Sequence, residues 1–436
     1  MKCRRINAQN EDLAQISQDL GLRGKMELGP ILDTVGAILA DVRQNKDESV
    51  RKYTLLFDKA DLPAGSIRVS ADEINRAVEQ IDPELLAVLE RAAGNIRSFH
   101  EKQMETGFTM DVADGAQIGM IVRPLAIAGI YVPGGTAPLP STVLMNVIPA
   151  KAAGVPRVVL CTPPRADGTI APVILAAAHI AGTDEIYKVG GAQAIAAMAY
   201  GTPSIPRVDK ICGPGNIYVN TAKRLVFGQV DIDMFAGPSE ILIIADDTAN
   251  PEFAAADMLS QAEHDKIASA ILLTTSESLA DAVAEAIDRR SERLERREIL
   301  EQSIRDYCAV VCVPDLETAI AFANELAPEH LELCIRDPEK YVPQILNAGA
   351  VFLGNYTPEP LGDYFAGPNH TLPTSGTARF FSPLNTGDFV KKMSILRYNE
   401  SSLRDCYQDV ARFADAEGLD GHAAAVRLRF EKETNT

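Results

Sequence analysis

Between about residue 118 and residue 245 the chain alternates short apolar runs with longer helical stretches, and this alternation limits the possible folds more than any other feature. The runs of strand length are Leu125–Val132, Arg157–Cys161, Glu185–Val189, Asp209–Cys212 and Ile241–Ala245. The helical stretches between them are Ser141–Ala153, Ala171–Ala181, Ala192–Tyr200 and Asn216–Val226. Strands that alternate with helices are typical of βα units, whose strands run parallel. The sequence therefore predicts an α/β fold built around a parallel sheet.

The same alternation resumes beyond residue 245. The predicted elements are a helix near Pro251–His264, a strand at Ala270–Thr274, a helix at Leu279–Arg293, a strand at Ala309–Val313, a helix at Leu316–Asn324 and an extended segment near Val351–Gly354. A chain of 436 residues also exceeds one ordinary hydrophobic core. We therefore expect two or more domains.

Helical periodicity precedes this alternating region, and a loop and a tail follow it. Residues from Pro30 to about Gln103 have the apolar spacing of helices, and Asp82-Pro83 supplies a helix start. From Tyr356 to about Thr377 the chain is rich in Gly, Pro, Thr and Asn, which predicts a long loop. Long loops inside compact enzymes are usually functional. The tail after Asp388 is predicted to be helical.

The charge balance argues against a nucleic-acid-binding protein. The chain has 60 acidic and 42 basic residues, a net charge of −18. A protein that binds a duplex needs a basic face to displace counterions, and no such cluster is visible. No run of eighteen apolar residues exists, so we expect no membrane span.

The cysteines indicate a reducing compartment. There are seven, an odd number, and most lie in apolar runs, as reduced core cysteines do. Cys308 and Cys312 have the spacing of a weak metal pair, but core packing is the favoured interpretation. Because the N-terminus also lacks the apolar segment of a secretory signal, we expect a cytoplasmic protein.

Three predicted strands end in glycine just before a helix: Tyr131-Val132-Pro133-Gly134-Gly135, Val189-Gly190-Gly191-Ala192-Gln193 and Cys212-Gly213-Pro214-Gly215-Asn216. Glycine lets backbone N–H groups approach an anion, and a helix start favours negative charge. Ligands of open parallel sheets bind beyond the carboxyl ends of the strands, where these turns lie. None matches G-x-G-x-x-G, and glycine also occurs at such turns for steric reasons. The turns thus leave both a nucleotide site and a purely steric role open.

A second group of residues has the composition of a metal site. Gln261 and His264 are three apart at the end of a predicted helix, so they share one face. Asp363 and His370 add a carboxylate and an imidazole within the long loop, and His422 adds an imidazole near the end of the chain. Glutamine is an infrequent metal ligand, so a pair such as Gln261–His264, taken alone, is more often a polar helix end.

Glu329 and His330 place a carboxylate directly beside an imidazole. Such a pair can take up and relay protons near neutral pH, because histidine titrates there and glutamate can be tuned toward it. Glu-His dipeptides also occur on surfaces by chance, and the dipeptide alone does not decide between the two.

Long, ordered motifs in this sequence resemble those of the histidinol dehydrogenase family. They are GIYVPGGTAPLPSTVLMNVIPAKAAGV (129–155), VGGAQAIAAMAYGT (189–202), KICGPGNIYVNTAKRLVFG (210–228), AGPSEILIIAD (236–246), SQAEHD (260–265), APEHLEL (327–333) and GDYFAGPNHTLPTSGTARF (362–380). The resemblance continues to EGLDGHAAAV (417–426) and so covers nearly the whole chain. The segments around Asn385–Asp388 and after His422 match less closely.

The resemblance implies an NAD-dependent enzyme with one zinc ion per subunit. Such an enzyme oxidises L-histidinol through L-histidinaldehyde to L-histidine with two NAD⁺, the last step of histidine biosynthesis. The metal would mainly orient the substrate, because Zn²⁺ accepts nitrogen ligands readily.

The resemblance also implies roles for individual residues. Glu329 and His330 would be the catalytic acid–base pair. Tyr131, Gln193 and Asn216 would contact NAD, and they fall on the three glycine turns. The expected zinc ligands are Gln261, His264, Asp363 and His422. Substrate contacts would come from Ser239, His330, His370, Glu417 and the four zinc ligands.

The expected architecture is two incomplete Rossmann-like, doubly wound domains with small helical terminal segments. The first would comprise residues 28–108 and 240–383 and carry the metal and acid–base residues. Residues 109–239 would be inserted into it and contact NAD. Residues 1–27 and 384–436 would form a terminal region that is exchanged in an intertwined homodimer with shared active sites.

Two other interpretations remain open. One is a zinc-dependent dehydrogenase of the same scaffold that acts on another small polyol, against which the presence of both Glu417 and His422 weighs. The other is a nucleotide- or metal-binding protein without turnover, against which the intact Glu329-His330 pair weighs. A turnover assay decides the second, and the most informative experiment is to count the NADH formed from L-histidinol per histidine produced.

Overall fold

The computed structural model describes residues 3–8, 16, 20, 29–134, 138–235 and 237–431. The chain forms two compact units, the first made of Met1–Gln103 with Leu125–Phe389 and the second of Met104–Pro124 with Val390–Thr436. The first unit contains two parallel sheets with flanking helices, so the predicted mixed α/β class is confirmed. No helix in the described ranges is long and apolar enough to cross a membrane.

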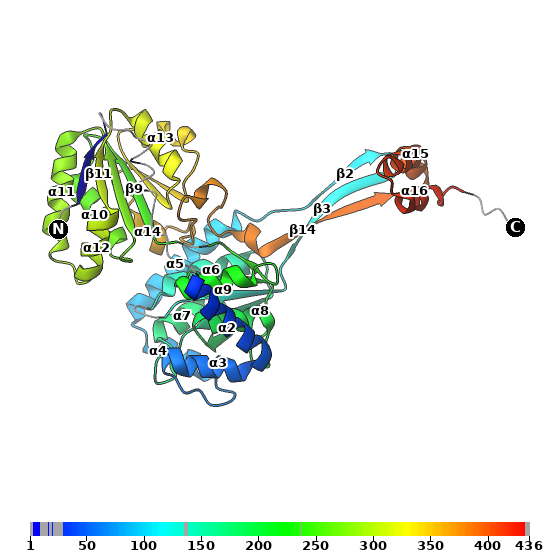
Figure 1. The fold of residues 1–436 in the computed structure, drawn as a ribbon, viewed down its shortest axis with the longest axis horizontal. Helices are drawn as coiled ribbons and strands as arrows, with labels where there is room; N and C mark the ends of the chain where they lie inside the picture. Colours follow the sequence, from blue (N-terminus) through cyan, green and yellow to red (C-terminus); the bar gives the residue numbers. More distant parts are fainter. Residues whose placement is uncertain are drawn as a thin grey trace. The chain divides into compact units, whose positions relative to one another are not determined.

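One sheet of the first unit has six strands, and all of its neighbouring strands are parallel. In spatial order they are β1 (Arg4–Asn7), β11 (Ala309–Cys312), β10 (Ser269–Thr274), β9 (Glu240–Ala245), β12 (His330–Cys334) and β13 (Ala350–Leu353). Its helices are α10 (Pro251–Ala262), α11 (Glu277–Ser291), α12 (Arg297–Tyr307) and α13 (Leu316–Leu326) (Figure 1). The buried faces of these elements form apolar clusters around β9, β10 and β11.

The other sheet has five parallel strands. In spatial order they are β6 (Glu185–Lys188), β5 (Arg157–Thr162), β4 (Ile127–Tyr131), β7 (Lys210–Cys212) and β8 (Asp231–Ile232). The helices α6 (Pro140–Ala152), α7 (Pro172–Ala181), α8 (Gly191–Tyr200) and α9 (Ile217–Val226) connect them. The predicted strands and helices of this region are therefore confirmed to within about two residues at each end.

Both sheets have the same order of strands. Numbered along the chain within each sheet, β4 to β8 and β9 to β13 both lie in the order 3-2-1-4-5. The second and third strands of each set therefore lie on one side of its first strand, and the fourth and fifth lie on the other. The strand order reverses next to this first strand, which is β4 in one sheet and β9 in the other. In open α/β sheets, ligands bind at this reversal, beyond the carboxyl ends of the strands.

The N-terminal helices pack on the five-stranded sheet. They are α2 (Gly29–Asn45), α3 (Asp47–Tyr53), α4 (Ala71–Gln80) and α5 (Pro83–Glu101), with a π-helical turn η1 (Thr54–Asp58) after α3. The apolar face of α2, including Val35 and Leu39, joins the cluster of α8 and α9, while α4 and α5 contact α6 and α7. The apolar faces of these helices are thus complementary to helices of the segment that is predicted to be inserted. The division into domains itself stays a prediction.

The extreme N-terminus also differs from expectation. Residues 4–7 form β1, which pairs in parallel with β11 at the edge of the six-stranded sheet. This segment therefore extends the sheet and is not part of a tail region with the C-terminus. Residues 9–27, the rest of the expected N-terminal segment, lie outside the described residues except for residues 16 and 20.

The second unit is a three-stranded antiparallel sheet followed by two helices. Its strands are β2 (Phe108–Ala113), β3 (Ala116–Pro124) and β14 (Val390–Tyr398), and its helices are α15 (Glu400–Ala416) and α16 (Asp420–Arg427). The prediction of a wholly helical tail is thus wrong for residues 390–398. These residues lack Gly and Pro and pair along their whole length with β3, and such pairing overrides a weak helical pattern.

The predicted long loop at Tyr356–Thr377 is interrupted by regular structure. Residues 359–364 form the short helix α14, and residues 377–379 form a 3-10 turn. Pro358 and Pro360 argued against a helix in the sequence. Proline is nevertheless tolerated at the first positions of a helix, because the backbone N–H that it lacks would have no partner within the helix there. α14 positions two carboxylates of the site.

Candidate active site

His330 is held by the main chain of the neighbouring strand. It begins β12, and its register partner Ile241 lies in β9, directly after Glu240. The Nδ1 atom of His330 lies 2.9 Å from the backbone carbonyl oxygen of Glu240. Because a carbonyl oxygen only accepts hydrogen bonds, this contact assigns the proton of the neutral ring to Nδ1. The Nε2 atom is left available as the reactive nitrogen.

Glu329 lies behind this imidazole and is almost fully buried. Its Oε2 atom accepts a hydrogen bond of 2.9 Å from the backbone N–H of Glu240 and lies 3.7 Å from Nδ1 of His330. Burial raises the pKa of the Glu329 carboxyl to about 8, although the adjacent imidazole acts to lower it. The carboxyl group is thus tuned toward neutral pH, where it can exchange protons.

Two carboxylates of α14 face the other ring nitrogen. Glu359 and Asp363 are four residues apart, so they lie on one side of the helix. The Nε2 atom of His330 lies 3.7 Å from Oε1 of Glu359 and 3.8 Å from Oδ1 of Asp363. Sequence reasoning missed Glu359. The four-residue spacing between Glu359 and Asp363 is the sequence signal that could have identified it, but the surrounding prolines argued against a helix there.

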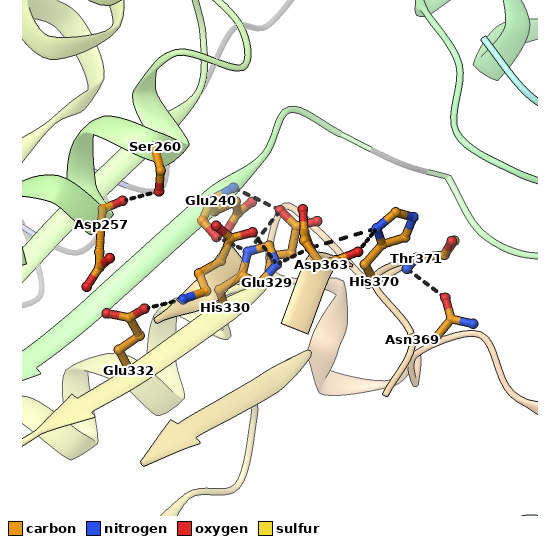
Figure 2. Close-up of polar contacts among 11 residues, drawn as sticks. Glu240, Asp257, Ser260, Glu329, His330, Glu332, Asp363, Asn369, His370 and Thr371 are labelled. Carbon is orange, nitrogen blue, oxygen red and sulfur yellow. Dashed lines mark hydrogen bonds and ion pairs between the residues drawn. The ribbon is translucent and has the colours of Figure 1, made fainter. Parts of the chain in front are cut away.

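A buried side chain from β12 fixes the start of α14. The Oε1 atom of Glu332 accepts a hydrogen bond of 2.8 Å from the backbone N–H of Glu359. Burial raises the pKa of Glu332 well above its ordinary value, and the neighbouring Asp257 adds to this effect. β12 therefore supplies His330 and also positions, through Glu332, the helix that faces it (Figure 2).

The carboxylates around His330 dominate its protonation. Burial alone would lower the pKa of the imidazole, but Glu329, Asp363 and Glu359 together raise it to about 10. Conversely, burial would raise the pKa of Asp363, but its contact with His330 and the charge of His370 lower it to about 2. The imidazole of His330 and the carboxylate of Asp363 thus favour each other's charged forms.

His370 completes this side of the site. Its Nδ1 atom lies 3.1 Å from the backbone carbonyl oxygen of Asp363 and 3.9 Å from Oδ1 of the same residue. The preceding residue, Asn369, donates a hydrogen bond of 2.6 Å to the backbone oxygen of Met145 and lies 3.4 Å from Nε2 of His100. Figure 2 shows His330, Asp363 and His370 converging, with Glu329 and Glu240 beside them.

The end of α10 approaches the same carboxylate. Burial lowers the pKa of His264, and among the charged groups that act on it Asp363 and His330 have the largest effects. Gln261 is completely buried, and neither atom of its amide has a hydrogen-bond partner within the described part of the chain. An unpaired buried amide is costly unless a ligand satisfies it. Gln261, His264 and Asp363 thus offer oxygen and nitrogen donors of the kind that Zn²⁺ accepts.

A tighter set of possible ligands overlaps this one. Among the described residues, ligand atoms of His330, Glu359 and Asp363 lie within 4.8 Å of one another. Asp363 is common to this set and the expected one. Cys308 and Cys312, considered above as a weak metal pair, belong to no such group in the described ranges. Neither thiol forms a disulfide, and both are buried, in keeping with the favoured interpretation of core packing.

A cavity of about 740 Å³ opens at the glycine turns of the five-stranded sheet. Its lining includes Tyr131, Gln193 and Asn216, the three residues expected to contact a nucleotide, and also His264. Gln193 is fully buried, and its amide is unpaired within the described residues. The cavity lies where the strand order reverses and is of the size that small-molecule ligands occupy.

The turns of this cavity are locked together by close contacts. The hydroxyl of Tyr131 accepts a hydrogen bond of 3.1 Å from the backbone N–H of Gly191. Gly213 has φ +116°, and a Cβ atom there would meet the carbonyl oxygen of Tyr131 at 2.0 Å. A side chain at this position is therefore excluded both by conformation and by space. The side-chain oxygen of Asn216 caps α9 through the N–H groups of Tyr218 and Val219.

A buried ion pair supports the third turn. Lys223 and Asp233 contact each other, and both side chains are only 1% exposed. Lys223 donates a hydrogen bond of 2.9 Å to the carbonyl oxygen of Gly213, and Asp233 accepts one of 2.7 Å from the N–H of the same residue. Both polar groups of the Gly213 backbone are thereby fixed.

A second cavity, of about 480 Å³, reaches His330 from the side of β13 and α14. His330, Asp363 and His370 line it together with mostly apolar residues such as Phe352 and Leu372. The acid–base group is therefore accessible to a small molecule.

The remaining expected site residues are distributed between the two units. Ser239 directly precedes Glu240 at the amino end of β9. Glu417 caps the end of α15, and His422 lies in the first turn of α16, so both belong to the second unit. Of the expected residues in the first unit, His330, Asp363 and His370 line one cavity, and Tyr131, Gln193, Asn216 and His264 line the other. The roles of Glu417 and His422 stay predictions.

Comparison with known proteins identifies the family. Residues 22–430 match the family model described as histidinol dehydrogenase. The chain is 53% identical over 398 residues to a histidinol dehydrogenase of Heliobacterium mobile, covering 91% of this chain and 93% of the relative. It is also 53% identical over 408 residues to one of Caldanaerobacter subterraneus, covering 94% of both chains. The crystal structure of histidinol dehydrogenase from Elizabethkingia anophelis superposes with a TM-score of 0.93 at 41% identity, covering 98% of both chains. The chain belongs to the histidinol dehydrogenase family of oxidoreductases.

Proposed function

We propose that this protein oxidises L-histidinol through L-histidinaldehyde to L-histidine with two NAD⁺, the last step of histidine biosynthesis. The observation that carries the proposal is the buried group of Glu329, His330 and Asp363 close to His264, which also lines the nucleotide-sized cavity. Proton transfer and hydride transfer require such adjacent sites. We further propose that the two 3-2-1-4-5 sheets are incomplete Rossmann-like domains, of which the five-stranded one binds the cofactor.

In the first oxidation, an alcohol must lose a proton from oxygen and a hydride from carbon. The Nε2 atom of His330 is the acceptor of the proton, because Nδ1 is engaged with the carbonyl oxygen of Glu240. NAD⁺, when bound, supplies the hydride acceptor. Tyr131, Gln193 and Asn216 would hold it on the glycine turns, where the unpaired amide of Gln193 is available for hydrogen bonds.

The second oxidation requires water to add to the aldehyde. A carboxylate adjacent to the base can remove a proton from that water, and Glu329 has this position. Its raised pKa gives it the affinity for a proton that a general base at neutral pH requires. Retaining the aldehyde between the two steps requires that both residues act on one bound molecule.

Zinc would be held by Gln261, His264 and Asp363 of one chain together with His422. When bound, the ion supplies a positive charge and open positions for the amine and imidazole nitrogens of the substrate. The pKa of His330 is raised partly by the charge of Asp363, so neutralising that carboxylate favours the neutral imidazole that a base requires. Ser239, His370 and Glu417 would contact the substrate.

We also propose a homodimer with shared sites. The apolar core of the second unit consists of Ala411, Ala414 and Ala423. Its sheet instead exposes large apolar side chains, namely Phe108, Met110, Val112, Met393, Ile395 and Leu396. A small sheet with so little core is not stable alone, so a second copy of the chain is the expected cover.

The direct test is to count products. The purified, zinc-loaded protein is incubated with L-histidinol and excess NAD⁺, and NADH, histidine and free aldehyde are measured. We expect about two NADH per histidinol, the number that two successive two-electron oxidations require, with no aldehyde accumulating. Release of aldehyde after one NADH would refute the two-step assignment, while oxidation of other polyols but not histidinol would support the rival dehydrogenase.

A further inference from the structure

The cavity of about 740 Å³ at the glycine turns has one wall that contains neither a glycine turn nor a residue expected to contact NAD. Phe57 and Asp58 line it, and they lie in the π-helical turn η1, which ends at Lys59 with φ +60°. Single π-helical turns are rare and often occur at functional sites. This turn is the only one of its kind in the described chain.

Phe57 offers a preorganised apolar surface. Its side chain is 51% exposed, although it lines a cavity. The ring stacks on Tyr53 with centroids 5.7 Å apart and planes inclined by 10°. The ammonium group of Lys52 lies 4.9 Å from the centre of the Tyr53 ring and is paired with Asp41. A planar ring such as adenine can therefore pack on Phe57 without reordering it.

Asp58 offers a carboxylate without a partner. Its Oδ2 atom is buried and accepts no hydrogen bond from any described residue. Burial raises the pKa of Asp58 to about 6, so the group is ionised at neutral pH. A carboxylate accepts hydrogen bonds and cannot donate them when ionised. The missing partner is therefore a donor, such as a ligand hydroxyl.

The place of His264 indicates which end of a dinucleotide lies at Asp58. His264 and Arg296 line the cavity. His264 is proposed to hold the metal together with Asp363, whose Oδ1 atom lies 3.8 Å from Nε2 of His330, so the nicotinamide belongs at the wall of His264. Phe57 and Asp58 lie in η1 and belong to neither the proposed metal group nor the acid–base pair. The adenosine end is thus left for the wall of Phe57 and Asp58.

We propose that Asp58 accepts hydrogen bonds from the ribose hydroxyls of the adenosine and thereby selects NAD⁺ over NADP⁺. The proposal rests on the proposed NAD-dependent function and adds the residue that sets cofactor choice. A phosphate on the 2′-hydroxyl removes one donor and brings a second negative charge against the carboxylate. Both effects disfavour the phosphorylated cofactor.

The test compares wild type with Asp58→Asn and Asp58→Ser. Calorimetric titration measures the affinities for ADP-ribose and for 2′-phospho-ADP-ribose, which needs no catalysis. Steady-state assays with L-histidinol give kcat/KM for NAD⁺ and NADP⁺. The matched control is Asp61→Asn, an exposed acid three residues away that does not line the cavity.

Both variants should bind ADP-ribose more weakly by about ten- to a hundredfold, the value of a hydrogen bond to a charged group. Their preference for the unphosphorylated ligand should fall by at least a similar factor, and the control should match wild type. An unchanged preference in both variants, with wild type active on NAD⁺, would overturn the role of Asp58. Wild type that neither binds ADP-ribose nor reduces NAD⁺ would instead refute the proposed function.

Discussion

The Nδ1 atom of His330 is hydrogen-bonded to the backbone carbonyl oxygen of Glu240, across the neighbouring parallel strands β12 and β9. The acceptor is a main-chain atom of a strand that is buried throughout. The orientation and the tautomer of the imidazole therefore follow from the sheet itself and not from a mobile side chain. A base held in this way needs no rearrangement before it accepts a proton.

The first prediction concerns the base. In His330→Asn, the side-chain nitrogen can still donate to Glu240, but no group remains to accept the proton of the substrate. Both oxidations should slow by about 10²- to 10⁴-fold, the usual contribution of a general base. Assays started from histidinol and from histidinaldehyde measure the two steps separately.

The zinc content of the same variant distinguishes a base from a ligand. If Gln261, His264, Asp363 and His422 hold the ion, elemental analysis of His330→Asn should show normal zinc. Loss of zinc would mean that the tight group of His330, Glu359 and Asp363 is the metal site.

The second prediction concerns removal of the metal. A chelator should abolish activity and weaken the binding of histidinol, because the proposed role of the ion is to anchor the amine and imidazole nitrogens. The fold should persist, because the two sheets of the first unit have extensive apolar cores of their own. Circular dichroism and calorimetric titration with histidinol measure the two properties. Undiminished binding by the stripped protein would exclude zinc as the substrate anchor.

The third prediction concerns the ion pair beneath the Gly213 turn. Lys223→Met leaves the carboxylate of Asp233 buried without its cation. Loss of one partner of a buried pair costs about 3–5 kcal/mol. We expect a loss of this size in denaturant unfolding, together with weaker ADP-ribose binding because the turn loses a contact.

A surface pair serves as the control for Lys223→Met. The Lys52 side chain is 61% exposed and pairs with Asp41, so Lys52→Met should destabilise the fold much less than Lys223→Met does. Equal losses in the free energy of unfolding for the two substitutions would show that burial does not strengthen the contribution of the Lys223–Asp233 pair to stability.

The fourth prediction concerns pH and stability. Burial raises the pKa of Asp58 from 3.8 to about 6, so the folded protein binds this proton more tightly than the unfolded chain does. The ionised carboxylate therefore destabilises the fold increasingly as pH rises from about 4 to 6, and fully above that range. Asp58→Asn should raise the thermal midpoint at pH 8 and change it little at pH 4, whereas Asp61→Asn should do neither.

Asp58→Asn should thus raise the thermal stability at pH 8 and weaken the binding of ADP-ribose. Residues that bind ligands are commonly kept at some cost in stability. A variant that is less stable at pH 8 would show that Asp58 has a stabilising partner in solution.

Local patterns predicted the elements that carry local signals. The glycine turns at Gly190 and Gly213 were visible because glycine, an apolar run and a helical stretch are contiguous in the sequence. β14 could not be predicted in this way, because its stability comes from pairing with β3, which is far away along the chain. Its exposed faces also lack the clear alternation of apolar and polar residues that marks a half-buried strand.

The same distinction applies to the site. The Glu329-His330 dipeptide could be singled out from its composition, whereas Glu359 depends on α14, whose start is fixed by Glu332 of β12. Asp58 lies in a helical stretch without any motif, and only the cavity and the missing hydrogen-bond partner single it out. Contacts between distant segments are what the sequence alone could not supply.

The last prediction concerns Glu417 and His422. Both lie in the second unit, whose apolar core is three alanines and whose sheet exposes large apolar side chains. Such a segment must dock on another surface to be ordered. In a two-fold dimer, exchanged tails create two identical sites, each completed by the other chain. We therefore expect each zinc to have three ligands from one chain and His422 from its partner.

Complementation tests this arrangement. Chains carrying His330→Ala are co-refolded with chains carrying His422→Ala, each of which is inactive by itself. A hybrid dimer with exchanged tails has one site in which the intact His330 of one chain meets the intact His422 of the other. Because random pairing makes half of the dimers hybrids, and each hybrid has one working site of two, activity should return to about a quarter of wild type. If each tail serves its own chain, every site in the hybrid lacks one residue, and the mixture stays as inactive as the separate variants.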